Sequence, residues 1–260
     1  MFVRWTLPPS LLVSFHPEQP KQLSIRSMKT YSKILAASIL SALALNVQAA
    51  TYLDATSDTF TGAGGGILDI SSVEVNNTAT DLIFKINLVG DPVATDWAKY
   101  VIGFDTVPGG DPAGNGWARP IGMSSGMDYW VGSWADSGNG ANLYNFTGAW
   151  NFQSATYGPN TDNLLVTKDA SSLTVQFNFA GLGLAPGSTF LFDVYTTAGG
   201  GGDGAIDALG NPGVTIGDWG NPYDSGSAVN SYTISVVPEP TTLALLGVGA
   251  SLLIGRIRRR

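Results

Sequence analysis

The sequence has no cysteine and only one histidine, His16. Without cysteine the chain cannot form a disulfide, a thiolate nucleophile or a cysteine-ligated zinc site. His16 lies near the N-terminus, so residues 51–237 have no side chain that titrates near neutral pH at its ordinary pKa. Serine–histidine and cysteine–histidine catalytic pairs are therefore excluded from this central stretch.

Basic residues are also scarce in the centre of the chain. Residues 51–237 hold four basic residues and eighteen acidic ones, which gives a net charge of −14. Nucleic acid and anionic lipid are bound through clustered Lys and Arg. The composition therefore predicts no nucleic-acid partner and suits cations, neutral glycans or plain solubility. The four basic residues are Lys85, Lys99, Arg119 and Lys168.

Long apolar segments are missing too, and the two short ones lie near the ends. Residues 28–50 read MKTYSKILAASILSALALNVQAA, with Lys29 and Lys33 before an apolar run and a small-x-small sequence that ends at Ala49. This is the layout of a secretory signal peptide, cut after Ala49 or Ala50. It predicts the Sec translocon and signal peptidase as partners. The alternative is an N-terminal anchor helix.

Residues 1–27 do not fit in front of a signal peptide. They contain four prolines and no clear periodicity. We predict that they are a start-site artefact, with translation beginning at Met28, or a disordered extension.

The C-terminal segment has three parts in a fixed order. The turn sequence Val237-Pro238-Glu239-Pro240 precedes an apolar run of 15 residues, Thr241 to Gly255. A helix of that length spans about 22 Å, less than the roughly 30 Å of a bilayer core. Positive charge stays on the cytoplasmic side, so the segment predicts export of the preceding domain. The terminal positive charges are Arg256, Arg258, Arg259 and Arg260.

Residues 237–260 resemble the PEP-CTERM sorting signal of Gram-negative bacteria. The resemblance implies recognition by an exosortase, a membrane cysteine protease-transpeptidase, and processing near Pro238-Glu239-Pro240. It further implies a transient stay in the inner membrane, then the cell surface or the extracellular matrix, where the family is associated with exopolysaccharide and biofilm. The alternative is a permanent tail anchor that thins the bilayer locally.

The stretch 51–236 predicts an all-β domain. Apolar and polar residues alternate along 82–88 and 173–179, which is typical of half-buried strands, and no segment has a convincing helical period. Gly-, Asn- and Asp-rich turns separate many such short runs. We predict a single antiparallel β-sandwich of jelly-roll type. Further strands are expected at 67–75, 99–105, 127–134, 142–146, 163–167, 190–196 and 228–235.

Three stretches of this domain are similar to a known group of sandwiches. They are TYLDATSDTFTGAGGGILDISSVEVNN followed by DLIFKINL, then KYVIGFDTVPGGDPAGNG, and then FLFDVYTTAGGGGDGAIDALGNPG. The group contains family 9 carbohydrate-binding modules and DOMON-type domains. The resemblance implies a sandwich that binds carbohydrate and performs no catalysis.

Aromatic residues are the candidate glycan ligands. Sugar C–H faces stack on aromatic rings, and the polar edges of Trp and Tyr bond to hydroxyls. The densest stretch contains Trp130 and Trp134, which share one face of a strand, while Tyr129 points to the other. These three residues and Trp117 are the predicted ligand-binding residues. The alternative is that the rings fill the sandwich core.

Aspartates are the candidate calcium ligands. Calcium takes six to eight oxygens, and Gly-rich loops expose backbone carbonyls well. One predicted site combines Asp105 and Asp111 with Asn115, and a second combines Asp193, Asp203 and Asp207. Asp54 and Asp58 form a third candidate. The alternative is that these residues serve ordinary turns and solubility.

The sequence therefore predicts an exported, non-catalytic domain that associates with exopolysaccharide or another glycan. One alternative is a purely structural or cation-binding matrix protein. Another is a glycoside-active enzyme that uses paired aspartates, although no acid stands out in a hydrophobic setting that would raise its pKa.

Overall fold

The structure is a computed structural model, and it describes residues 49–237. Within this range the chain forms strands joined by loops, with two short 3-10 helices at Gly64–Gly66 and Phe179–Leu182. The longer strands are β2 (Ile70–Asn77), β3 (Asp81–Leu88), β4 (Lys99–Asp105), β6 (Tyr129–Trp134), β7 (Gly140–Phe146), β8 (Trp150–Ala155), β10 (Ser172–Asn178) and β11 (Thr189–Thr197). The shorter ones are β1 (Ala50–Leu53), β5 (Ile121–Gly122), β9 (Leu165–Lys168), β12 (Asp207–Ala208), β13 (Tyr223–Asp224) and β14 (Asn230–Thr233).

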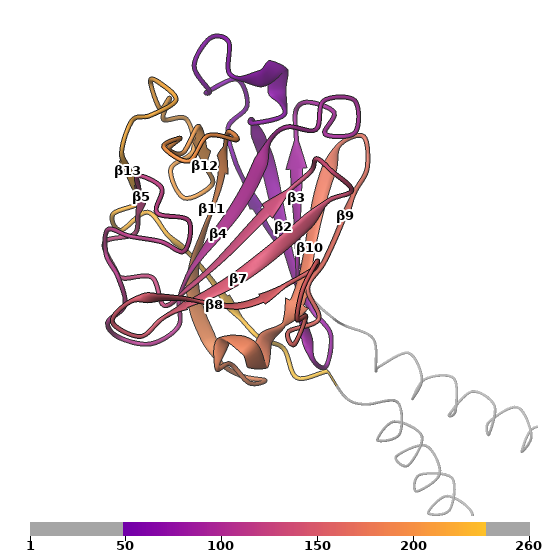
Figure 1. Ribbon diagram of the computed structural model, residues 1–260, viewed down its shortest axis with the longest axis vertical. Helices are drawn as coiled ribbons and strands as arrows, with labels where there is room; N and C mark the ends of the chain where they lie inside the picture. Colours follow the sequence, from indigo (N-terminus) through magenta and orange to yellow (C-terminus); the bar gives the residue numbers. More distant parts are fainter. Residues whose placement is uncertain (1–48, 238–260) are drawn as a thin grey trace, which may run out of the picture. The chain divides into compact units, whose positions relative to one another are not determined.

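Two antiparallel sheets pack face to face (Figure 1). The first sheet has the strand order β1-β2-β3-β10-β9, and the second has the order β12-β11-β4-β6-β7-β8, with β14 also paired to β11. The predicted all-β antiparallel sandwich is confirmed. The likeness to carbohydrate-binding and DOMON-type domains in particular stays a prediction.

The main core lies between the two sheets and is built around phenylalanine rings. The Phe84 ring centroid lies 5.6 Å from that of Phe104, 6.0 Å from that of Phe177 and 5.2 Å from that of Phe192. In β3 every second side chain is buried, so this strand turns one face to the core and the other to solvent. The alternation predicted for 82–88 and 173–179 is thus the pattern that forms this core.

The second sheet is covered on both faces. In β4 the side chain of Ile102 belongs to the main core, whereas that of its neighbour Val101 belongs to a second apolar cluster on the outer side. Val194 and Tyr195 divide in the same way in β11. The loops that carry β5 and β13 lie over this outer side (Figure 1) and contribute Ile121 to the second cluster.

Strand prediction succeeded where alternation was strong and failed for two edge strands and for the two-residue strands β5, β12 and β13. The predicted strand 99–105 has the bounds of β4, and the others overlap β2, β6, β7, β9, β11 and β14. β1 and β8 were not predicted, because edge strands bury fewer side chains and lack a clear period. Within residues 49–237 no helix is long and apolar enough to cross a membrane. The predicted signal peptide at 28–50, except its last two residues, and nearly all of the predicted sorting tail lie outside the described range.

Substituting Phe84 tests the main core. Phe84→Ala removes a fully buried ring and should lower the free energy of unfolding by about 3–5 kcal/mol. Phe152→Ala is the matched control: this ring is 46% exposed, and its loss should cost under about 1 kcal/mol. Urea unfolding followed by circular dichroism measures both. Equal losses in the two variants would contradict the assigned core.

Candidate functional site

Part of the outer face of the second sheet carries partly exposed aromatic rings. In the strand register Trp130 of β6 pairs with Tyr144 of β7, and Tyr144 pairs with Phe152 of β8, so these three side chains share the outer face. Trp134 lies four residues after Trp130 and points to the same side. Its ring centroid is 5.8 Å from that of Tyr157, which follows β8.

Small residues beneath the rings let them lie flat on the sheet. An added β-carbon at Gly132 would lie 2.1 Å from the Trp117 ring, and one at Gly140 would lie 2.2 Å from the Trp134 ring. Only glycine leaves room for these contacts. The Trp117 indole N–H also donates to Asn142 Oδ1 at 2.9 Å, which fixes the orientation of the ring.

We call Trp117, Trp134, Tyr144, Phe152 and Tyr157 the aromatic strip. Tyr157 is 70% exposed and Phe152 is 46% exposed, and the other three are partly buried. Burial, and next the electrostatic influence of Tyr157, raise the pKa of the Tyr144 hydroxyl. The strip offers flat apolar surface with polar edges, the combination that stacks on sugar rings.

Two of the four predicted aromatic ligands lie in the aromatic strip, and the other two pack in or against the apolar cores. Trp117 and Trp134 belong to the aromatic strip. Trp130 is fully buried in the second apolar cluster, so the predicted stacking role of this ring is wrong. Tyr129 packs against the main core on the opposite side of β6. Tyr144, Phe152 and Tyr157 were missed, and the only sequence signal for them was their density between residues 144 and 157.

Two of the three residues of the predicted calcium site at Asp105, Asp111 and Asn115 are held by loop hydrogen bonds. Asp111 Oδ1 accepts the backbone N–H groups of Ala113 and Gly114, and its Oδ2 accepts the Trp150 indole N–H at 2.9 Å. Asn115 donates to the carbonyl oxygens of Arg119 and Ile121, so its side chain holds a turn. These side chains are thus committed to loop structure.

The predicted site at Asp193, Asp203 and Asp207 is not formed. Asp193 is fully buried, where Ser225 Oγ donates to its Oδ2 and Gly210 N–H donates to its Oδ1. Burial raises the pKa of Asp193 to about 7. Asp203 accepts the Gly200 N–H and closes a turn. Of the three, only Asp207 joins a group of acids.

That group contains the third predicted pair. Asp54, Asp58 and Asp207 place one carboxylate oxygen each within 4.8 Å of one another, the only such trio in residues 49–237. Asp69 lies close by, since its Oδ2 accepts the N–H of Ser57, the residue before Asp58, at 2.8 Å. We call these four residues the acidic cluster. Burial is the main cause that raises the pKa of Asp54 to about 7 and that of Asp207 to about 8.

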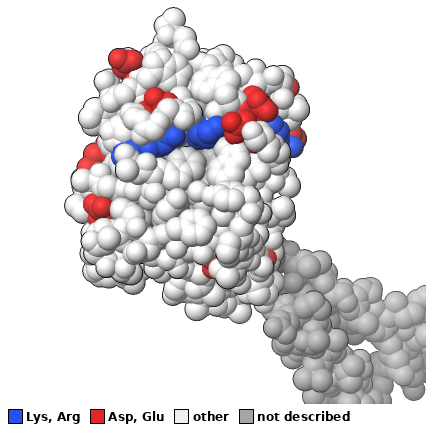
Figure 2. All heavy atoms as spheres, viewed as in Figure 1, with Lys and Arg blue, Asp and Glu red and all other residues white. Residues whose placement is uncertain are grey.

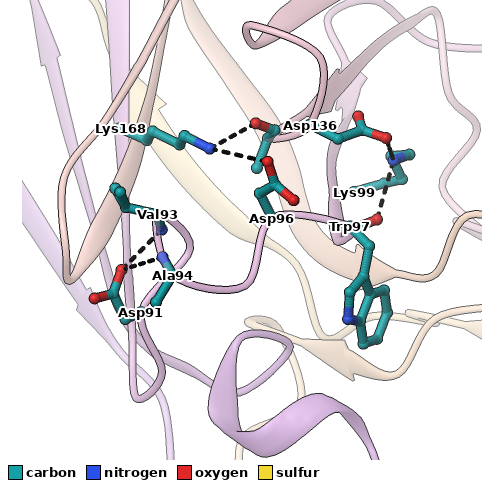
Figure 3. A network of polar contacts seen from close by, with 9 residues as sticks. Asp91, Val93, Ala94, Asp96, Trp97, Lys99, Asp136 and Lys168 are labelled. Carbon is teal, nitrogen blue, oxygen red and sulfur yellow. Dashed lines mark hydrogen bonds and ion pairs between the residues drawn. The ribbon is translucent and has the colours of Figure 1, made fainter.

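The lysines of the domain are paired elsewhere. In Figure 2 the Lys and Arg atoms form one band, with acidic atoms beside it and further acidic atoms scattered over the same face. Lys99 pairs with Asp136 at 3.1 Å, and Lys168 pairs with Asp96 at 3.7 Å while donating to the Ala135 carbonyl oxygen (Figure 3). Lys99 thus joins β4 to the turn after β6, and Lys168 joins the end of β9 to that turn and to the loop before β4.

A shallow hollow of about 240 Å³ lies between β1 and β14, and none of its lining residues is acidic. Its lining residues are Ala50, Tyr52, Ser231, Tyr232, Thr233 and Ser235.

Residues 236–260 match the family model described as the PEP-CTERM protein-sorting motif. This match confirms the predicted sorting signal. The chain is an exported protein that is held transiently at the membrane and processed by an exosortase. A search of curated proteins finds no match to the chain.

Replacing Asp193 tests its assigned role as a buried acid. Its raised pKa means that the folded state favours the protonated form, so stability is lost as pH rises from about 4 through about 7. Asp193→Asn mimics the protonated acid at every pH. The variant should therefore have a higher free energy of unfolding than wild type at pH 8. The difference between the two free energies should become smaller towards pH 4. Urea unfolding at both pH values measures the two free energies. An equal difference at pH 8 and pH 4 would contradict the assignment of Asp193 as a buried acid with a raised pKa.

Proposed function

We propose that the protein is a non-catalytic glycan-associating protein of the cell surface or extracellular matrix of a Gram-negative bacterium. The observation that carries the proposal is the aromatic strip. Rings from β6, β7 and β8 and from two loops lie on one face, and two of them are well exposed. An extended polysaccharide can lie along such a surface, because each ring contacts a sugar face without a deep pocket.

The charge of the domain is compatible with that ligand. With a net charge of −14 between residues 51 and 237, the domain repels polyanions and suits a neutral or cation-bridged polysaccharide. Exopolysaccharide of the host is therefore the proposed partner. The alternative of a purely structural or cation-binding matrix protein makes no use of the strip.

The buried position of the acids supports a non-catalytic role. A glycosidase places two carboxyl groups on either side of the scissile bond, with room for a sugar between them. In the acidic cluster Asp58 is 8% exposed and Asp207 is 3% exposed, and backbone N–H groups hold both. A glycosidic bond has no access to that position.

Removing the exposed rings tests the proposal. Tyr157→Ala and Phe152→Ala should each weaken retention on the host's exopolysaccharide by about 2–13-fold, since one stacking contact contributes about 0.5–1.5 kcal/mol. Affinity electrophoresis in gels that contain the polysaccharide measures the retention.

Leu53→Ala is the matched control, because Leu53 is also strongly exposed at 76% but lies on β1 of the other sheet. It should leave retention unchanged. If wild type is not retained, or if the control loses as much as the strip variants, the strip is not a glycan surface.

Replacing the Pro-Glu-Pro motif tests the sorting signal. Replacing Pro238, Glu239 and Pro240 by alanine removes the motif where processing is proposed. The altered chain should accumulate as an unprocessed, membrane-associated form, whereas wild type should appear as a shorter form outside the inner membrane. Immunoblots of cell fractions compare the two chains. Identical processing of both would contradict a role for this motif.

A further inference from the structure

The acidic cluster gathers carboxylates from distant parts of the chain. Asp54 follows β1, Asp58 lies four residues later, Asp69 comes directly before β2, and Asp207 begins β12. Backbone groups orient all four, and in Asp54 the N–H of Ala55 donates to Oδ1 at 2.9 Å. Gly213 N–H donates to Asp58 Oδ2 at 2.8 Å, Ser57 N–H donates to Asp69 Oδ2 at 2.8 Å, and Ile70 N–H donates to Asp207 Oδ2 at 2.7 Å.

The remaining oxygens of three of these acids lack a hydrogen-bond partner in the protein. They are Asp54 Oδ2, Asp58 Oδ1 and Asp69 Oδ1, and all three atoms are buried. Asp58 as a whole is 8% exposed and Asp69 is 4% exposed. Buried carboxylate oxygens are costly unless a donor or a cation satisfies them. Each of these acids thus has one oxygen fixed by the backbone and one left over.

The described part of the chain supplies no cation for these oxygens. Lys85, Lys99 and Lys168 form ion pairs with Glu74, Asp136 and Asp96, respectively. Arg119 donates to Thr197 Oγ1 at 2.8 Å and to the Asp203 carbonyl oxygen at 3.0 Å. All four basic residues of the domain are therefore engaged away from the acidic cluster.

We propose that the acidic cluster is a calcium site, with Asp54, Asp58 and Asp207 as ligands and Asp69 as a fourth carboxylate beside them. Two oxygens bound to one calcium ion lie at most about 5 Å apart, since each Ca–O distance is about 2.3–2.6 Å. The 4.8 Å spacing of the trio fits this limit.

The oxygen-only donor set selects calcium among common metals. Zinc prefers nitrogen and sulfur ligands, and magnesium keeps several of its waters and demands a near-ideal octahedron. Several converging carboxylates that are largely removed from solvent suit the larger, more flexible coordination sphere of calcium. Extracellular modules bind calcium with Kd values of about 10⁻⁴–10⁻³ M, a range that fits an exported protein.

A bound calcium ion would join the two sheets. Asp54 and Asp69 flank β1 and β2 in the first sheet, whereas Asp207 lies in β12 of the second. The hydrogen bond from Ile70 to Asp207 already connects these edges. The ion would bind the carboxylates only in their folded arrangement, so it would stabilise the folded protein over the unfolded one.

Calcium binding is tested on the full-length chain, purified in mild detergent and stripped with EDTA. Calorimetric titration with CaCl₂ should show saturable binding. At a calcium concentration about one hundredfold above Kd, the Tm should rise by about 5–10 °C. MgCl₂ at the same concentration should produce a clearly smaller rise.

Asp58→Asn should abolish most of the calcium-dependent rise in Tm. In EDTA the same variant should be at least as stable as wild type, because it removes one of several like charges. A merely structural role of Asp58 would instead lower the Tm of the variant in EDTA.

Asp54→Asn, at a less buried position, gives the same test if Asp58→Asn does not fold. Asp218→Asn, an exposed acid of the nearby loop, is the matched control and should keep the full rise.

Three results would overturn the proposal. One is a wild-type Tm that does not respond to CaCl₂. Another is a calcium response of Asp58→Asn and Asp54→Asn equal to that of wild type. The third is a response to MgCl₂ as large as the response to CaCl₂.

Discussion

The structure depends on the second sheet being apolar on both faces. A strand with successive buried residues such as Val101 and Ile102 cannot leave either face in water, so the first sheet covers one face and loops must cover the other. The long Gly-rich loops around β5 and β13 perform this task, and Trp130 and Tyr195 stack beneath them with ring centroids 6.4 Å apart. These loops are thus a second layer of core packing.

The positions of both candidate sites depend on how far these loops cover the outer face of the second sheet. The loops cover β11, β4 and much of β6 and β7, where Asn142 is buried, and well-exposed rings remain at Phe152 of β8 and at Tyr157 after it. The chain that covers β11 also carries Asp207 in β12 to the start of the first sheet, where it meets Asp54 and Asp58. One packing requirement therefore exposes an aromatic surface in one place and gathers acids in another.

Periodicity in the sequence predicted the sandwich because apolar alternation directly reports which strand face is buried. It could not predict which aromatic rings stay exposed. Trp130 and Trp134 were correctly expected to share a face, but a period of two does not show how far a distant loop covers that face. The prediction of calcium ligands from nearby aspartates failed for a related reason. Asp193, Asp203 and Asp207 are neighbours in sequence, whereas the acidic cluster joins residues about 150 positions apart. The sorting signal was predictable because it is contiguous.

The tryptophan indole N–H signals in a ¹H–¹⁵N spectrum, recorded with and without oligosaccharides of the host's exopolysaccharide, show whether glycan binds to the aromatic strip. The signals of Trp117 and Trp134 should shift on titration, while that of the buried Trp130 should shift little. Unchanged spectra, or shifts confined to Trp97 and Trp219 outside the strip, would contradict the assignment of the outer face of β6 to β8 as the glycan surface.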